Sequence, residues 1–444
     1  LTTVDHKKIG ILYVGLAFTF FVLGGVMALF IRLELSQPGA QVVDAATYNQ
    51  LFSMHGTTMI FLFVIPMFAG LGNYFVPLHI GARDMAFPRL NALSFWMALG
   101  GGLVMYSSLL VGAPEAGWTG YSPLANSIFS KSIGTDLWIL GLLLIGQSSL
   151  LGAINFIVTI LNMRTPGMTM TRIPLFDWSI LTMSMMVLAS TPVLAGALVM
   201  LLFDRNFGTT FFSGPGADPA MWQHMFWFYS HPAVYIMVLP AMGIVSEVLP
   251  VFSRKPIFGY KAIAYSTAAI GLFGFLVWAH HMFTSGMSAY LRIPFMYSTL
   301  LVAVPTGVKF FSWVATIWEG KLSFETPMLF VLGAISIFLL GGLSGPPNAT
   351  VATDLHLQDT YWIVGHFHAT MFGGFVFPFF AAIYYWFPKV TGRMYNEKLG
   401  KLHFFLMLPG FYVQSLSQMQ AGLLGMRRRI GDYDPALGIN LQQL

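Results

Sequence analysis

Long apolar stretches divide the chain, and short polar segments separate them. A helix needs roughly 20 predominantly apolar residues to cross the hydrocarbon core of a bilayer. Stretches of about this length recur at 9–32, 56–78, 91–113, 137–162, 177–202, 225–252, 259–283, 294–317, 328–346, 361–386 and 402–425. The pattern predicts an all-α integral membrane protein, a polytopic bundle of about eleven visible transmembrane helices with no inserted soluble domain.

Composition supports this fold and narrows the chemistry. Only 9% of the 444 residues are charged and 56% are hydrophobic, whereas about a quarter of a soluble domain is charged. The chain contains no cysteine, which excludes disulfides, thiolate ligands, iron–sulfur clusters and covalently attached c-type heme. Its net charge of +5 is spread over short loops, so we expect no nucleic acid partner.

The loop charges predict an orientation. Lys7 and Lys8 precede the first span, and with the N-terminus in the cytoplasm most Lys and Arg residues fall on the cytoplasmic side, as the positive-inside rule requires. Half of the basic residues on the outer side form one run, Arg427–Arg429, which indicates an anion nearby. We expect one transmembrane domain, 1–444, that is truncated at both ends because it begins at Leu1 and ends at Leu444.

Six histidines fall near the outer ends of their predicted spans. A single histidine within a membrane is more often a hydrogen-bonded core residue than a ligand, but six at one depth favour metal binding, for which neutral imidazole is well suited. They are His55, His231, His280, His281, His366 and His368.

Their spacing predicts two kinds of site. His366 and His368 are two residues apart, so on a helix they point about 200° apart and would serve different cofactors. His280 and His281 are adjacent at a predicted helix end, where a loosened turn would let both approach one metal, with His231 as a third ligand. Three imidazoles with an open position suit a copper ion that meets a substrate.

The segments around these residues resemble subunit I of the heme–copper oxidases nearly end to end. Six motifs occur in the family's order: Phe52–Met59, Asp84–Arg89, Trp227–Tyr235, Trp278–Thr284, Pro305–Lys309 and Val364–His368. The resemblance implies the catalytic subunit of a type A proton-pumping terminal oxidase, which reduces O2 to water with four electrons. The family has twelve spans, with two hemes and a copper ion held between helices.

The resemblance also implies a role for each histidine. His55 and His368 would be the axial ligands of a low-spin heme, and His366 the ligand of the high-spin heme that reacts with O2. His231, His280 and His281 would bind copper B, and the hemes would be heme A. Tyr235 lies one helical turn after His231, and in the family this catalytic tyrosine is joined to the histidine and supplies an electron and a proton for O–O cleavage.

Basic residues would surround the hemes. Arg32 resembles the family's partner for the formyl group of the low-spin heme, although an arginine that reaches toward the interface is an equal alternative. Arg428 and Arg429 occupy positions that pair with heme propionates, because a guanidinium matches a carboxylate. Arg427 stands where the family usually has proline.

Further residues match positions near the hemes. Trp227 resembles a heme-binding residue, and Trp118 and Tyr121 resemble residues at the heme edges, with placement in an interfacial aromatic belt as the alternative. Asp359 matches a magnesium-region carboxylate, but Gln358 stands where the family has a histidine, so magnesium binding stays open.

A K-type proton channel would consist of Lys309, Thr306 and Ser246, leading toward Tyr235. A lysine within a span costs about 2.5–3.5 kcal/mol on insertion scales, which makes it a functional candidate. Its alternative is a lysine that extends to the cytoplasmic interface.

A D-type proton channel would begin at Asp84, with Asn73 and Asn91, although Asp84 by itself would be an ordinary loop carboxylate. The family's terminal glutamate is replaced by Ala233 here. Tyr229 and Ser230 match a Tyr-Ser variant often found in prokaryotes, so we expect them to replace the glutamate and the protein to lie in a prokaryotic plasma (inner) membrane.

The choice of electron donor is indicated by polar residues that quinol-oxidising relatives have and this chain lacks. Quinol-oxidising relatives carry polar residues where this chain has the apolar Leu23–Met27, and a histidine where it has Thr47, which favours cytochrome c over quinol. Electrons would then arrive through a subunit II with a dinuclear copper centre, beside subunit III and small membrane subunits. Nitric oxide reductase ranks lower because it lacks equivalents of Tyr235 and Lys309, and a transporter or heme-only electron carrier would not need the copper ligands.

Overall fold

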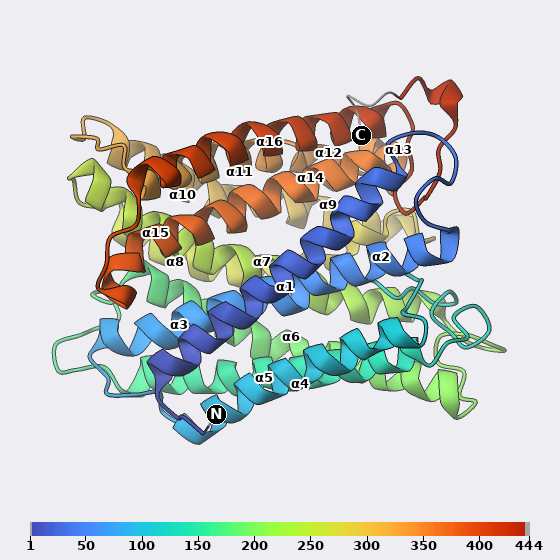
Figure 1. Ribbon diagram of the computed structural model, residues 1–444, viewed down its shortest axis with the longest axis horizontal. Coiled ribbons are helices and arrows are strands. Elements are labelled where there is room, and N and C mark those ends of the chain that lie inside the picture. The colour runs from blue at the N-terminus through green and yellow to red at the C-terminus, as the bar shows by residue number, and fades with distance from the viewer. Residues whose placement is uncertain (1, 440–444) are drawn as a thin grey trace. The chain divides into compact units, whose positions relative to one another are not determined.

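The computed structural model of the protein describes residues 2–439. Leu1 and the predicted cut at Asn440–Leu444 lie outside the described residues. Within the described part, the long elements are all helices, and extended pairing is limited to an isolated antiparallel bridge between Thr360 and Arg427 (Figure 1). The prediction of an all-α fold is confirmed.

Ten helical stretches of the described part are long and apolar enough to cross a membrane, and each coincides with a predicted span. The eleventh predicted span, 402–425, also forms a helix, but it is not among these ten because Gln and Ser are frequent in its second half. The ten are His6–Glu34, Ala45–Ile80, Pro88–Leu110, Gly134–Asn162, Leu175–Asn206, Pro219–Ser253, Tyr260–Met282, Ala289–Ile317, Thr326–Ala349 and Tyr361–Thr391.

Several of these stretches are built from more than one helix. The α-helices are α1 (His6–Glu34), α2 (Ala45–Thr57), α3 (Ile65–Ile80), α4 (Pro88–Ser107), α5 (Gly134–Asn162), α6 (Leu175–Asn206), α7 (Pro219–Ser253), α8 (Tyr260–Phe273), α9 (Ala289–Leu301), α10 (Ala303–Ile317), α11 (Thr326–Leu343), α12 (Gly345–Ala349), α13 (Val351–Leu357), α14 (Tyr361–Met371), α15 (Phe377–Thr391) and α16 (Glu397–Leu423).

The helices carrying the predicted ligands depart from regular α geometry near them. A π-helical segment, η1 (Thr58–Val64), follows His55, and another, η5 (Phe372–Val376), follows His368. After α8 ends, His280 and His281 lie in a 3-10 turn, η4 (Trp278–Met282). The turn at His280 and His281 therefore departs from α geometry, which is the condition under which both could approach one metal, and such departures are frequent at functional sites.

The chain divides into two compact units. The first comprises the chain up to Met170, Met183–Ile236 and Arg429–Asp434. In it α1 packs on α3, and α4 on α5. Glycines allow both approaches: a Cβ on Gly10 would lie 2.7 Å from the carbonyl oxygen of Gly70, and one on Gly101 would lie 2.8 Å from that of Gly141. Small residues of this kind are typical of contacts between membrane helices.

The second unit comprises Thr171–Thr182, Met237–Arg428 and the chain from Pro435. In it α14 packs on α16, and α11 on α15. Gly365 lies directly before His366, and a Cβ added there would lie 2.6 Å from the carbonyl oxygen of Ser415 on α16. The helix that carries His366 and His368 is therefore held close to α16 by the absence of a side chain.

Candidate metal centre and proton routes

Three predicted copper ligands form a group that fits a metal site. His231, His280 and His281 each offer one ring nitrogen, and these atoms lie within 4.8 Å of one another. His231 is buried, whereas His280 and His281 are half-buried. A set of neutral nitrogen donors without a thiolate or carboxylate is a donor set that copper accepts.

Hydrogen bonding sets the tautomer of His280. Its Nδ1 lies 3.0 Å from Thr299 Oγ1 on α9, and the hydroxyl of Thr299 donates to the carbonyl oxygen of Phe295 at 2.6 Å. Because that hydrogen is used, Thr299 accepts from Nδ1, which places the lone pair of His280 on Nε2. The ring centroids of His280 and His281 are 4.2 Å apart.

His231 and Tyr235 project from the same face of α7, as their spacing predicts. Their ring centroids are 4.8 Å apart and the rings meet edge to face at 65°. The ring of Tyr235 is therefore held next to one member of the metal-binding group.

His55 is positioned by α1. Its Nδ1 lies 2.9 Å from the carbonyl oxygen of Gly24, and because a carbonyl only accepts, Nδ1 carries the hydrogen and Nε2 the lone pair. Arg32, in the last turn of the same helix α1, is close enough to interact electrostatically with His55. The hydrogen bond thus leaves Nε2 of His55 as the ring nitrogen that a metal could bind.

His366 and His368 have different hydrogen-bond partners. His366 Nδ1 lies 2.8 Å from Ser344 Oγ, whose hydroxyl donates to the carbonyl oxygen of Gly341. His368 Nδ1 instead bonds to Val364 O, one turn earlier in its own helix, at 2.8 Å. In both rings the Nδ1 hydrogen is used and Nε2 carries the lone pair, which suits a metal ligand.

The basic run contacts a carboxylate of the protein itself. Arg428 Nε is 3.8 Å from Asp359 Oδ1, and the backbone N–H of Arg428 donates to the carbonyl oxygen of Asp359. The guanidinium of Arg428 also lies 5.7 Å from the ring centre of Phe367. Gln358 Nε2 donates to the carbonyl oxygen of His281 at 3.2 Å. The segment with the predicted magnesium-region residue is therefore tied to a predicted copper ligand.

Arg429 and the three aromatic residues matched to the heme surroundings form a second contact group. Arg429 donates to Thr119 Oγ1 at 3.2 Å and lies 5.6 Å from the ring centre of Tyr121. Trp227 Nε1 donates to the hydroxyl of Tyr121 at 2.6 Å, and Trp118 packs edge to face on Trp227. Sequence reasoning named these aromatic residues but gave no contact between them.

Lys309 is almost fully buried, with 1% of its surface exposed. Its Nζ donates to Thr267 Oγ1 of α8, a residue that sequence reasoning missed. Thr306 donates to Val302 O within its own helix, and Ser246 accepts from Trp313 Nε1 at 2.9 Å. The structure therefore places Lys309 directly on Thr267, rather than on the two predicted channel residues.

A cavity of about 40 Å³ lies beyond Asn73 in the first unit. Its polar lining includes Tyr13, Ser94 and Ser148, and the hydroxyl of Tyr13 bonds to both serines, at 2.9 and 3.2 Å. A water needs roughly 10–15 Å³ of such volume, so the cavity can hold a short chain of waters. Ser94 and Ser148 could have been identified from the sequence, because each is a polar residue within a predicted apolar span.

Of the three predicted D-channel residues, Asn73 lines this cavity, whereas Asp84 and Asn91 do not. Asn91 is fully buried and neither of its amide atoms has a hydrogen-bond partner among the described residues. Asn73 donates to Ala69 O at 2.7 Å and leaves its side-chain oxygen without one. Asp84 is half-buried and accepts from the N–H of Met85. Buried amides in this state are groups that water satisfies.

Tyr229 and Ser230 are buried side by side in α7. The ring of Tyr229 stacks on Phe61 at 6.1 Å, and Ser230 Oγ has no hydrogen-bond partner among the described residues. Ala233, one turn after Tyr229, is buried as well. Two buried side chains with hydroxyl groups thus lie within one helical turn of Ala233, the position at which the resemblance implies a glutamate.

Asp354 is a buried carboxyl group that sequence reasoning did not select. It is 1% exposed in α13, and its Oδ2 has no hydrogen-bond partner among the described residues. Burial, with the nearby charge of Asp359, raises the pKa of Asp354 to about 8. The group is therefore protonated at neutral pH, which its position in a short polar segment did not indicate.

Comparison with known proteins adds independent evidence. Residues 8–443 match the family described as "Cytochrome C and Quinol oxidase polypeptide I". Cytochrome c oxidase subunit 1 of Synechocystis sp. is 54% identical over 432 residues, covering 97% of this chain and 78% of the relative. The protein of the same name from Thermostichus vulcanus is 53% identical over 434 residues, with 97% and 78% covered.

A solved structure shares the fold. One chain of a heme–copper terminal oxidase dimer, determined by cryo-EM, superposes with a TM-score of 0.80 at 20% identity, covering 96% of this chain and 76% of that chain. The histidine motifs of the sequence and the helical architecture agree with these similarities. The chain therefore belongs to the cytochrome c and quinol oxidase polypeptide I family, the subunit 1 oxidoreductases of the heme–copper oxidases.

Proposed function

We propose that this chain is the catalytic subunit of a proton-pumping terminal oxidase that reduces O2 to water with electrons from cytochrome c or a similar small redox protein. The observation that carries the proposal is the group of His231, His280 and His281, with the ring of Tyr235 beside His231. It combines an imidazole metal site with a hydroxyl group in a membrane protein of the oxidase family.

The ligand assignments are those that the family resemblance implies, and imidazole donors are compatible with them. Copper B is bound by the three grouped histidines, the high-spin heme by His366 and the low-spin heme by His55 and His368. When bound, the two hemes, which we assign as heme A, and the copper supply the redox chemistry of O2 reduction. The side chains assigned to the heme periphery are Arg32, Arg428, Arg429 and Trp227.

Reduction of O2 with four electrons consumes four protons, which must cross apolar protein. Lys309 Nζ is assigned to take up a proton from the cytoplasmic side and to pass it on through the hydroxyl of Thr267. Thr306 and Ser246 complete this K-type route, and Tyr235 holds the proton that is delivered at the metal site. The burial of Lys309 favours this role, since a lysine without function would extend to water.

A second route begins at Asp84 and continues past Asn91 and Asn73. The cavity lined by Tyr13, Ser94 and Ser148 extends it with hydroxyl groups. We assign its far end to Tyr229 and Ser230, in the manner of the Tyr-Ser variant of type A enzymes. Hydroxyl groups can relay a proton along bound water without themselves being ionised.

As a subunit 1, the chain works with partner subunits in a bacterial membrane, which it crosses several times. We propose that residues 1–444 act as one catalytic domain in a prokaryotic plasma membrane, with the N-terminus in the cytoplasm. The partners are a subunit II with a dinuclear copper centre, subunit III and small membrane subunits. Asp359 is assigned to the magnesium region.

The proposal is tested on the purified complex by reduced-minus-oxidised and CO-difference spectra with copper and iron analysis. Two hemes, one of which binds CO, and one copper in this subunit are expected. His281→Ala should lose that copper and keep both hemes, whereas His356→Ala, at an exposed histidine of α13, should keep all three. Two hemes with a non-heme iron and no copper would assign the protein to nitric oxide reduction instead.

A further inference from the structure

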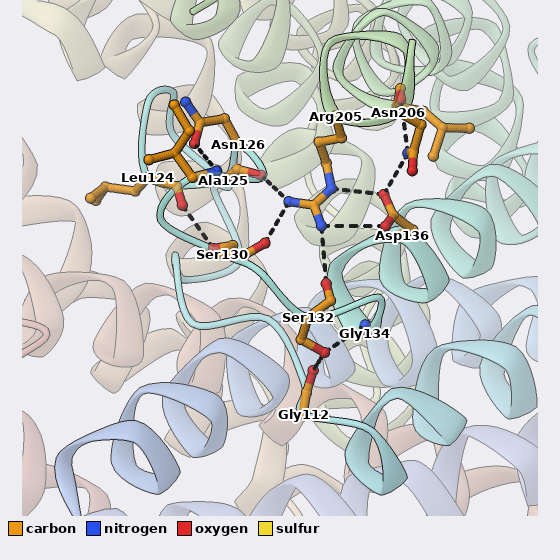
Figure 2. Close-up of polar contacts among 12 residues, drawn as sticks. Gly112, Leu124, Ala125, Asn126, Ser130, Ser132, Gly134, Asp136, Arg205 and Asn206 are labelled. Carbon is orange, nitrogen blue, oxygen red and sulfur yellow. Dashed lines mark hydrogen bonds and ion pairs between the residues drawn. The ribbon is translucent and has the colours of Figure 1, made fainter. Parts of the chain in front are cut away.

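One buried arginine outside the sites described above uses all of its donors. Arg205 lies at the end of α6 with a side chain that is 2% exposed. Figure 2 shows its guanidinium group between Asp136, in the first turn of α5, and residues of the loop that precedes α5, which are Ala125, Ser130 and Ser132. This loop, residues 111–133, is called the 111–133 loop below.

The guanidinium group makes five hydrogen bonds. Nε and Nη2 contact the two carboxylate oxygens of Asp136, at 2.7 and 3.3 Å. Nη1 donates to the carbonyl oxygens of Ala125 and Ser130, at 2.7 and 2.9 Å, and Nη2 donates to that of Ser132 at 3.0 Å. A guanidinium has five N–H groups, so none remains for another ligand.

These bonds fix the second half of the 111–133 loop to two helices. The side chain of Ser132 extends the contact, because its Oγ lies 2.6 Å from the carbonyl oxygen of Gly112 and accepts from the N–H of Gly134 at 2.9 Å. Both ends of the loop are therefore joined through the same cluster, which Figure 2 shows around Arg205.

The first half of the same loop packs on the helix of His55. The N–H of Gly117 donates to Ser53 Oγ at 2.8 Å, and Trp118 lies so close to Gly56 that a Cβ there would be 3.0 Å from the indole. Thr119 and Tyr121 follow, with their contacts to Arg429 and Trp227. The loop thus reaches the residues on either side of His55.

We propose that the Arg205–Asp136 pair is a positioning clamp that holds the 111–133 loop against the His55 helix and so sets the surroundings of the low-spin heme. The proposal rests on the heme ligation by His55 given under Proposed function. Arg205 contacts neither His55 nor Arg429 among its five bonds, so it acts through the loop and is a positioning residue.

The geometry requires arginine rather than any cation. A lysine offers three donors from one point and cannot face a carboxylate and three separate carbonyl oxygens together. In Asp136→Asn the arginine keeps its three backbone bonds, so that variant weakens the clamp without opening it. Lys131, an exposed residue of the same loop, provides a control in which a positive charge is removed but no bond of the clamp is lost.

The test uses purified holoenzyme of Arg205→Lys, Asp136→Asn and Lys131→Gln. Heme and copper content, hydrogen exchange of the amides in Gly117–Ser122, and the absorption maximum of the low-spin heme are measured. In Arg205→Lys we expect full cofactor content, exchange at least about tenfold faster in this segment, and a shifted low-spin absorption maximum. Asp136→Asn should show both changes to a smaller degree, and Lys131→Gln neither.

Exchange in Gly117–Ser122 as slow as in the parent would overturn the clamp, and faster exchange with an unchanged absorption maximum would overturn its link to the heme. If Arg205→Lys does not assemble, the same two criteria apply to Asp136→Asn. The proposed function is tested separately by the low-spin heme signal. It fails if the parent enzyme lacks this signal or if His55→Ala leaves the signal in place. The exchange result then still decides whether the clamp exists.

Discussion

At the residue scale, hydrogen bonds determine which ring nitrogen can bind a metal in four of the six predicted histidine ligands. His55, His280, His366 and His368 each use Nδ1 in a hydrogen bond, to a carbonyl oxygen or to a hydroxyl whose own hydrogen is used. An outer hydrogen bond of this kind orients the ring and raises its basicity as a ligand. Asp354 shows the influence of its surroundings at a single side chain, because burial and the nearby charge of Asp359 raise its pKa.

Removing the hydroxyl of Thr267 should slow proton uptake through the K-type route. Thr267→Val keeps the shape of the side chain but leaves Lys309 Nζ without its partner, and a hydrogen bond to a charged group contributes about 1.5–3 kcal/mol. We expect internal reduction of the high-spin heme to slow by roughly tenfold or more, measured by stopped-flow spectroscopy. Ser266→Ala, which removes a neighbouring hydroxyl that donates to Ile263 O, is the control, and an equal rate in both variants would contradict the assignment.

Asp354 should make the stability of the protein depend on pH. Its pKa is raised from 3.8 to about 8, so between these values the folded state binds more protons than the unfolded state and stability falls as pH rises. In that pH window the unfolding free energy of the parent falls by up to roughly 1.4 kcal/mol per pH unit because of this group, and Asp354→Asn removes that dependence.

Thermal unfolding in detergent at pH 5 and pH 8 measures the effect. The gain of Asp354→Asn over the parent should be larger at pH 8 than at pH 5. Asp44→Asn is a suitable comparison, because backbone and side-chain hydrogen bonds from Thr47 lower the pKa of this exposed carboxyl, and its stabilising contribution is present above the unfolded pKa and lost as pH falls. A gain from Asp354→Asn that is the same at both pH values would exclude a raised pKa.

At the element scale, glycines decide how closely the ligand-bearing helices pack. Gly365 on α14 faces Ser415 and Met419 of α16, whereas Gly342 on α11 has no atom within 4 Å of an added Cβ. Both are helical, so the same substitution has opposite consequences at the two positions. The difference lies in the packing, since helix propensity favours alanine at each.

Gly365→Ala should therefore destabilise the protein and disturb its hemes. The added methyl group would lie 2.6 Å from a backbone oxygen, and overpacking of this kind costs about 1–3 kcal/mol. Because His366 is the next residue, we also expect a lower content of CO-binding heme, measured by difference spectroscopy. Gly342→Ala should leave the spectrum unchanged and raise stability by roughly 0.5–1 kcal/mol, and a similar loss in both variants would show that packing at Gly365 is not limiting.

At the scale of the whole molecule, function depends on moving protons through a chain with few charges. The first unit holds the Tyr13 cavity and the Tyr229–Ser230 pair, and the second holds Lys309 on Thr267. Hydroxyl and amide groups outnumber ionisable ones along both, which keeps the cost of burial in a membrane low. Because the two proposed routes use different residues, each can be tested separately by mutation.

Tyr229→Phe with Ser230→Ala should uncouple the enzyme. The double variant removes both hydroxyls at the proposed end of the D-type route but no predicted metal ligand, so we expect O2 reduction to continue at a reduced rate while proton translocation is lost. The measurement is proton release per electron from reconstituted vesicles. Tyr106→Phe, which removes a hydroxyl bonded to Thr58 instead, is the control, and unchanged translocation in the double variant would argue against the Tyr-Ser assignment.

The sequence alone determined the features that depend on local composition. Ten predicted spans agree with the helices of the described part because an apolar stretch of membrane length has few alternatives to a helix. The histidine motifs and their family could be recognised because metal ligation restricts residue type at fixed spacing. The sequence also indicated that His280 and His281 could share a metal only where the turn loosens, since a regular helix separates adjacent side chains, and the structure shows a 3-10 turn there.

Only the tertiary structure decided which distant residues meet. Thr267 as the partner of Lys309, Ser344 behind His366, the buried state of Asp354 and the five bonds of Arg205 all join segments far apart in the chain or depend on such packing. Nothing in the local pattern distinguishes these polar residues from their neighbours. Their roles arise because a buried donor or acceptor needs a partner, and the packing of helices decides which partner is within reach.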